Sequence, residues 1–241
     1  MKLPKLTLTD ARRKFVREVG SVVLGVLIAL AIGELADAAR WKWRVNNSLQ
    51  AVAVELGGAR VNLEERIALQ PCMERRIAQI GAILKQARRT HSLPDVKAIG
   101  APSSQLVVNS AFQVAQSDGV FLHMDLERAR WLASIYTLVT TAYLNLTEQE
   151  HQSWRTLRLL ENSPGEVDSD LLASLLQAWS DARELGGSIG GVAEQGARSL
   201  REAGIAVPER YRTGRRGADE RRGAAVCATL IVDGKPTSAG P

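Results

Sequence analysis

The feature that most constrains this chain is an apolar run close to its N-terminus. Between Val19 and Leu35 the sequence reads VGSVVLGVLIALAIGEL, and Glu34 is its only charged side chain. A helix over these 17 residues rises about 25 Å, close to the roughly 30 Å of a bilayer's hydrocarbon core. Apolar and alanine-rich neighbours extend the run, so we predict a transmembrane helix over residues 19–39.

The residues on either side of the run predict its orientation. The arm 1–18 carries six basic side chains against Asp10 and Glu18. The positive-inside rule therefore predicts a cytoplasmic arm and export of the chain beyond about residue 40, although Arg40, Lys42 and Arg44 weaken the asymmetry. In a bacterium this places the protein in the inner membrane, with a periplasmic domain.

Four side chains are expected at the two membrane interfaces. Trp41 and Trp43 follow the run directly, where aromatic belts lie, and Lys14 and Arg17 can extend to the opposite headgroups. A cleaved signal peptide is the alternative, because Ala36-Asp37-Ala38 resembles a cleavage site. Cleavage there would release a secreted protein that begins at Ala39.

Small residues recur every fourth position along the predicted span. Ser21, Gly25, Ala29 and Gly33 form a smooth stripe on which another helix can approach closely. We predict membrane-helix packing through this stripe, with a second copy of the chain or with another membrane helix. Glycine and alanine are also frequent in membrane helices that have no partner, and that alternative stays open.

Composition predicts an all-α protein. Aromatic residues are only 5% of the chain, whereas alanine, leucine and arginine are abundant, which suits helices packed through aliphatic side chains. The net charge of +5 suggests nucleic-acid binding, but much of it lies in the N-terminal arm. Residues 40–241 hold 25 basic and 22 acidic side chains, so we expect no nucleic-acid partner.

Hydrophobic periodicity predicts an exported helical bundle over residues 40–205. A long amphipathic helix is expected over 43–85, with a kink or a restart at Pro71 and a lapse of the apolar stripe at Arg66 and Gln70. A loop is expected at 90–104, followed by a helix over 105–116 and another that begins near His123. A capping box at Thr147 and Glu150 predicts the start of a new helix, which should end at 162–165. The next helix should be capped by Asp168 or Ser169 and should stop at Gly186-Gly187, before a weak helix over 189–202.

The C-terminal part, residues 206–241, reads as an irregular tail rich in arginine and glycine. Only the strip 224–232 looks ordered, as a short β-like run. The two cysteines, Cys72 and Cys227, both fall on the predicted exported side, where an oxidising compartment permits a disulfide. We predict that they pair and fasten the tail to the long helix, the alternative being two unrelated thiols.

No motif in the sequence indicates a catalytic, cofactor or metal site. His91, His123 and His151 lie in separate segments without metal-ligand spacing, and neither a nucleophile elbow nor a phosphate-binding loop occurs. The arginine-rich stretch 210–223 suggests anionic lipid headgroups or a solvated tail. We therefore predict no catalysis and no cofactor, and a small-molecule ligand stays unknown.

The N-terminal 45 residues resemble a group of uncharacterised bacterial single-span membrane proteins. The basic arm with Phe15, Arg17 and Glu18, the segment Gly25–Leu30 and then Glu34 carry the resemblance. It implies a span that carries a helical, coiled-coil-like exported region, and it implies no activity. The resulting hypothesis is an anchored, non-catalytic interaction or structural module; the alternatives are a ligand-sensing bundle coupled to a partner, and a secreted protein.

Overall fold

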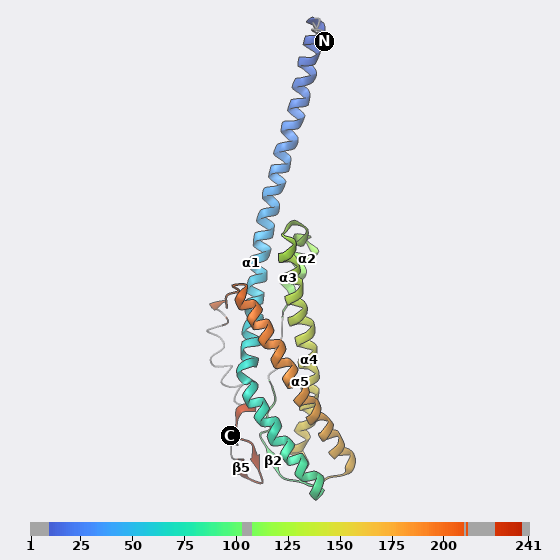
Figure 1. The fold of residues 1–241 in the computed structure, drawn as a ribbon, viewed down its shortest axis with the longest axis vertical. Coiled ribbons are helices and arrows are strands. Elements are labelled where there is room, and N and C mark those ends of the chain that lie inside the picture. Colours follow the sequence, from blue (N-terminus) through green and yellow to red (C-terminus); the bar gives the residue numbers. More distant parts are fainter. Residues whose placement is uncertain (1–9, 103–107, 210, 212–224, 238–241) are drawn as a thin grey trace, which may run out of the picture.

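The computed structural model describes residues 10–102, 108–209, 211 and 225–237, and its fold is all-α, as predicted. Figure 1 shows one very long helix with a group of helices packed along its lower half. The helices are α1 (Asp10–Thr90), α2 (Ser110–Ser117), α3 (Leu126–Tyr136), α4 (Tyr143–Leu157) and α5 (Ser169–Glu202). Two short 3₁₀-helices are η1 (Val120–His123) and η3 (Arg158–Asn162), and η2 (Thr137–Ala142) is a short π-helix.

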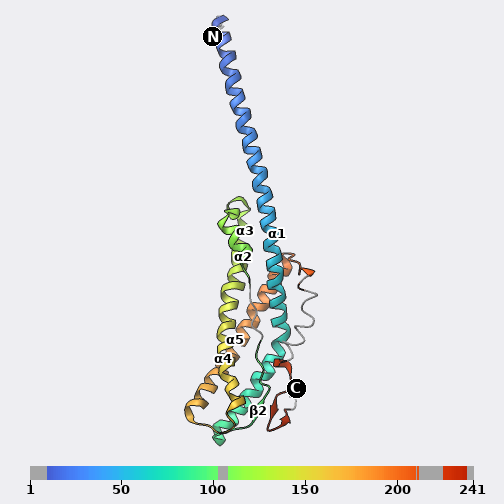
Figure 2. The ribbon, with the colours of Figure 1, turned by 180° about the vertical axis from the view of Figure 1, so that it is seen from behind.

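The upper half of α1 projects away from the rest of the molecule (Figures 1 and 2). Its apolar side chains are exposed all around the helix; Val22 is 67% exposed and Leu35 is 71% exposed. This part of α1 is apolar enough and long enough to cross a membrane. Leaving such a surface in water is unfavourable by about 25 cal/mol for each Å² of apolar area.

The lower half of α1 buries the predicted apolar stripe. Pro71 lies inside the helix, so the helix does not restart there. Proline has no backbone N–H to donate, and its ring crowds the preceding turn. The ribbon of α1 changes direction in its lower, teal part (Figure 1). The buried members of the stripe are Val52, Leu56, Ala59, Leu63, Met73, Ile77, Ile80 and Leu84.

Helices α3, η2 and α4 form one continuous run, and the predicted start at Thr147 is wrong. Asp125 caps α3 by accepting a hydrogen bond from the Arg128 amide at 3.0 Å. Thr147 lies inside α4, where its hydroxyl donates to the Leu144 carbonyl. Glu150 cannot reach back to a cap because its side chain is buried between helices. The π-helical turn η2 joins the two α-helices.

Helix α5 also runs farther than predicted. Asp168 caps it, accepting a hydrogen bond from the Leu171 amide at 2.7 Å, as expected. The predicted stop at Gly186-Gly187 is wrong, because α5 continues through both glycines to Glu202. Close packing against α1 and α4 holds this stretch in the helix, as described below.

Two small sheets fasten the loops at the lower end. Strand β1 (Ser92–Leu93) pairs with β3 (Gly165–Glu166), and β2 (Val96–Lys97) pairs with β4 (Ile231–Val232), which pairs with β5 (Lys235–Pro236). All three pairings are antiparallel. Part of the predicted β-like strip is a helical turn at 225–227, so only its end is a strand. The arginine-rich stretch lies outside the described residues except for Tyr211.

The buried apolar side chains form two cores stacked along α1. The upper core joins α1, α3, η2, α4 and the end of α5; its members include Leu56, Leu63, Val139, Tyr143, Ile189 and Leu200. The lower core joins α1, α4, the start of α5 and the C-terminal segment; its members include Ile80, Leu84, Trp154, Leu157, Leu175 and Leu230. All three long helices pass from one core to the other.

Candidate functional site at the junction of the two cores

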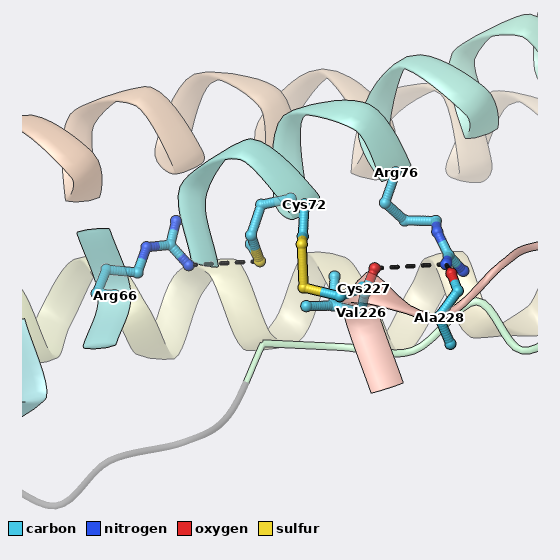
Figure 3. The surroundings of a disulfide bond; sticks show 7 residues. Arg66, Cys72, Arg76, Val226, Cys227 and Ala228 are labelled. Atoms are coloured by element: carbon cyan, nitrogen blue, oxygen red, sulfur yellow. Dashed lines mark hydrogen bonds between the residues drawn. A yellow bond between two sulfur atoms is a disulfide. The ribbon is translucent and has the colours of Figure 1, made fainter. Parts of the chain in front are cut away.

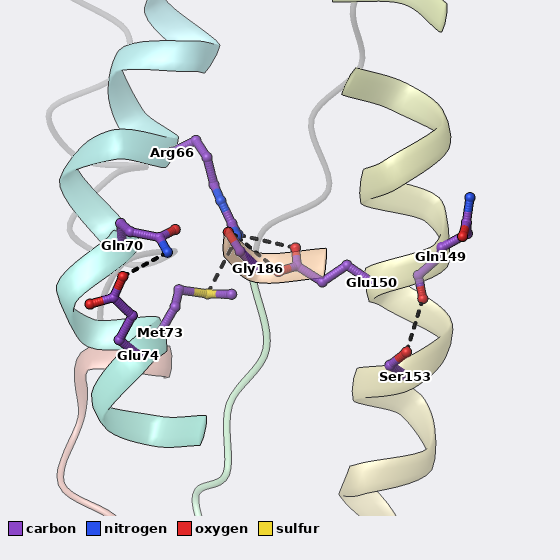
Figure 4. A network of polar contacts seen from close by, with 8 residues as sticks. All are labelled: Arg66, Gln70, Met73, Glu74, Gln149, Glu150, Ser153 and Gly186. Carbon is purple, nitrogen blue, oxygen red and sulfur yellow. Dashed lines mark hydrogen bonds and ion pairs between the residues drawn. The ribbon is translucent and has the colours of Figure 1, made fainter. Parts of the chain in front are cut away.

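A buried ion pair lies where the two cores meet. Arg66 of α1 donates two hydrogen bonds to the Glu150 carboxylate of α4, at 2.9 and 3.0 Å. The two side chains are only 5% and 1% exposed, respectively. Arg66 also contacts the Gly186 carbonyl of α5 at 3.4 Å and the Met73 sulfur at 3.6 Å (Figure 4). One guanidinium therefore links α1, α4 and α5.

The position of this pair explains the lapse in the apolar stripe of α1. Arg66 falls between Leu63 of the upper core and Met73 of the lower core, and Glu150 falls between Tyr143 and Trp154 on α4. Burial raises the pKa of Glu150, and the charge and hydrogen bonds of Arg66 oppose this rise. The bidentate contact pairs the two opposite charges in a place where neither is solvated.

Glycines of α5 lie against the pair and its neighbours, and the approach becomes closer along the helix from Gly186 to Gly196. A Cβ atom added at Gly186 would lie 3.6 Å from the Glu150 carboxylate, and one at Gly190 would lie 3.2 Å from the Gln70 side chain. Farther along, a Cβ at Gly196 would come within 2.8 Å of Leu63. Each glycine disfavours a helix by up to about 1 kcal/mol relative to alanine. Here the glycines are contact points between helices.

A second arginine of α1, Arg76, is buried ten positions after Arg66. It is 1% exposed, and carbonyl oxygens rather than a carboxylate surround its guanidinium. Nη1 donates to Ile99 at 2.7 Å and also to Ala98, and Nη2 donates to Val226 at 3.4 Å and also to Ala228 (Figure 3). Burial lowers the pKa of Arg76, the Glu161 charge opposes this, and the neighbouring Arg75 charge lowers it further.

The predicted disulfide between Cys72 and Cys227 is present and lies beside Arg76 (Figure 3). It closes a loop across 155 positions of sequence. Together with Arg76 and the pairing of β2 with β4, it attaches the segment 225–237 to the lower part of α1. The expectation that the C-terminal segment is fastened to the long helix is confirmed.

A further polar contact holds α2 in place at the upper end of the domain. Glu55 of α1 accepts a hydrogen bond from the Tyr136 hydroxyl at 2.6 Å and from the Ala111 amide at 2.9 Å. A carboxylate at the first turn of α2 compensates the positive end of the helix dipole. Burial, followed by the hydrogen bond to Glu55 and the charge of Glu55, raises the pKa of Tyr136 far above its ordinary value.

A cavity of about 420 Å³ opens between α1 and α5 beside the ion pair. Apolar side chains form most of its wall, namely Met73, Ile77, Trp179 and Ala182, and Gly186 and Gly187 leave the space open. Glu74 and Arg183 contribute charges to the lining. A cavity of this size and character suits a small, mostly apolar molecule.

The residues predicted to lie in or beside the membrane are all on the exposed part of α1. A Cβ atom at Gly25 or Gly33 would meet nothing within 4 Å, so their role in helix packing stays a prediction, as do those of Ser21 and Ala29. Lys14 and Arg17 are exposed. Trp43 is 67% exposed, whereas Trp41 stacks on His123 with ring centroids 3.6 Å apart.

The described residues contain no group of three or more His, Cys, Asp or Glu side chains that could hold a metal ion. The buried charges are engaged in the ion pair and in carbonyl contacts that hold helices together. The sequence shows that the apolar stripe lapses at Arg66 and Gln70. It does not show that Glu150 is the partner of Arg66, or that glycines of α5 lie opposite this part of α1.

Comparisons with known proteins give no further guide: no protein-family model, curated protein or solved structure matches the chain.

Proposed function

We propose that this chain is a single-pass, membrane-anchored envelope protein whose exported helical domain is a non-catalytic interaction or structural module. The observation that carries the proposal is the continuity of α1. One 81-residue helix includes both the exposed apolar segment 19–39 and the stripe that is buried in both cores. A bilayer around the apolar segment would remove its surface from water, and the domain would then be held rigidly on its anchor.

Two observations support export of the domain. The disulfide between Cys72 and Cys227 suits an oxidising compartment such as the bacterial periplasm. The N-terminal arm carries six basic side chains, whereas Arg40, Lys42 and Arg44 are the three that directly follow the span. This excess of lysine and arginine before the span favours a cytoplasmic N-terminus.

Membrane fractionation with N-terminal sequencing tests the anchor and its alternative. Expression in a Gram-negative host should give an intact chain in the inner membrane, with gel mobility that changes on reduction. A soluble product that begins at Ala39 would instead establish cleavage and a secreted protein. Protease added to spheroplasts should digest the domain; protection of the domain would reverse the orientation.

Self-association through the small-residue stripe has its own test. Ala29→Ile places a bulky side chain on the stripe, and Ala31→Ile places the same side chain on another face of the same helix. In a membrane two-hybrid assay Ala29→Ile should weaken association, whereas Ala31→Ile should not. Equal association of both variants would remove the oligomer from the proposal.

The cavity between α1 and α5 favours a ligand-sensing bundle as the second candidate. It lies beside the bend of α1, so a bound molecule would contact the helix that leads to the span. A metabolite screen by thermal shift should find a compound that stabilises the wild-type domain. Ala182→Trp, which fills the cavity, should abolish that stabilisation; a shift that survives would place the compound elsewhere.

A further inference from the structure

The turn between α2 and α3 is the part of the domain that lies beside the C-terminal end of the exposed half of α1, near Trp41 (Figure 1). It is joined there by the stack of His123 on Trp41, whose ring centroids are 3.6 Å apart. Trp41 follows the apolar segment 19–39 by two residues, which is a rise of about 3 Å along the helix. If that segment spans a bilayer, the turn therefore lies at the membrane interface.

The turn exposes apolar side chains at this level. Leu122 is 86% exposed, more than any large apolar side chain of the predicted span, and Leu126 is 60% exposed. Trp43 on the neighbouring α1 is 67% exposed. Phe121 and Met124, between and beside them, pack against the upper core. The turn thus has apolar residues that pack on the core and a further set that is mostly exposed.

The charges around the turn do not explain this arrangement. Asp118, Asp125 and Glu127 are acidic and exposed, and the exposed basic side chains nearby are Lys42, Arg44, Arg128 and Arg130. The two signs nearly balance, so attraction to anionic lipid is weak. Any contact with the bilayer would come from apolar insertion and from the amphipathic tryptophans.

We propose that the turn Gly119–Leu126 inserts into the interfacial region of the same bilayer that α1 crosses, with Leu122 and Leu126 as its apolar contacts. This proposal rests on the proposed transmembrane anchor. The lipid surface is the occupant because the turn is continuous, through the Trp41–His123 stack, with the end of the apolar segment. The domain would then touch the membrane at two places and keep a fixed tilt.

Spin labels at single cysteines in the full chain test the proposal. Cys72 and Cys227 are paired, so Leu122→Cys can be labelled without reductant. Leu30→Cys, within the predicted span, reports on the anchor. Leu159→Cys is the matched control, because Leu159 is an exposed leucine in η3, at the opposite end of the domain (Figure 1). Each protein is placed in uncharged phosphatidylcholine vesicles.

The measurement is the ratio of collisions with oxygen, which enters lipid, to collisions with a water-soluble nickel chelate. The label at Leu122→Cys should give a ratio at least threefold above that at Leu159→Cys, and the label at Leu30→Cys should give the highest ratio. Equal ratios at 122 and 159, with a high ratio at 30, would overturn the inserted turn and keep the anchor. A low ratio at 30 would overturn the anchor itself.

A second copy of the chain on the turn is the remaining outcome. It would reduce nickel collisions at 122 without raising oxygen collisions, and it would broaden the spectrum by coupling between labels. Dilution with unlabelled protein would remove that broadening. This result would overturn insertion into lipid and assign the turn to a contact between copies.

Discussion

The two buried arginines of α1 are ten positions apart, and they differ in what compensates their charge. Arg66 meets a carboxylate from another helix, whereas Arg76 meets backbone carbonyls of two loop segments. The first arrangement joins helices whose carbonyls mostly accept helical hydrogen bonds, so the close partner of Arg66 is a side chain and its carbonyl contact, to Gly186, is longer at 3.4 Å. The second holds chain that lacks helical hydrogen bonds and so presents its carbonyls. The same residue type therefore fixes helix register in one place and loop conformation in the other.

The largest effect is expected from the disulfide that reinforces the Arg76 region. Closing a loop of 155 positions stabilises the folded chain by about 5 kcal/mol in the chain-entropy description. Replacing both Cys72 and Cys227 with serine should lower the free energy of unfolding by up to this amount in urea titrations of the full chain in detergent. Reduction of the wild-type protein should give the same loss. An unchanged titration midpoint would mean that the carbonyl contacts of Arg76 suffice.

The Arg66 region should respond next, and in a non-additive way. Glu150→Leu leaves a buried guanidinium unpaired and should cost about 3–5 kcal/mol of unfolding free energy. The double variant Arg66→Met/Glu150→Leu removes both charges and should recover most of that loss. Urea titrations of the two single variants and the double variant give the coupling energy. Simple additivity would show that the pair does not join the helices.

Arg76→Met should have a smaller and more local effect. Loss of charged hydrogen bonds to carbonyls costs about 1.5–3 kcal/mol, and it falls on the segment 225–237 because that segment is held at Arg76. Amide hydrogen exchange should accelerate at Val226 and Leu230 while α4 stays protected. Arg75 is an exposed neighbour, so Arg75→Met should leave the exchange rates of Val226, Leu230 and α4 unchanged. Uniform acceleration across all helices would make Arg76 a general core residue like Arg66.

The smallest effect at neutral pH concerns Tyr136, and it grows in alkali. Burial and Glu55 raise the pKa of Tyr136 in the folded state, so above pH about 10 the unfolded chain loses this proton first. Stability contributed by the protonated phenol is complete below that pH and declines above it, by up to about 1.4 kcal/mol per pH unit. Tyr136→Phe should flatten this decline in thermal unfolding between pH 8 and 11. An identical slope would refute the assignment.

Much of the fold follows from periodicity and local caps. The stripe on α1, the cap at Asp168 and the pairing of two lone cysteines follow from spacing, local side-chain chemistry and the predicted compartment. The failures share one cause. Glu150 matched a capping residue and Gly186 matched a helix stop, yet both serve a contact between three helices. A local pattern carries no information about which distant residue lies opposite.

Two features of the sequence mark the candidate site at the core junction, and neither identifies the residues that meet there. Arg66 interrupts an apolar stripe, and a polar residue at such a position signals a partner without identifying it. The spacing of Gly186, Gly190, Ala193 and Ala197 on one buried face of α5 is a second signal, since small residues at this spacing permit close helix contact. Neither signal distinguishes a structural pair from a binding site without the geometry.

The glycines of α5 have a mechanical consequence. Gly196 allows Leu63 to approach where a Cβ atom would lie at 2.8 Å, and Gly81 of α1 does the same for Trp179. Sliding α5 along α1 by one turn would bring Val192 or Leu200 to the place of Gly196, and neither side chain would fit. The two helices therefore cannot act as a piston against each other. A displacement of α1 along its axis would carry α5 with it, so the lower half of the molecule would move as one body.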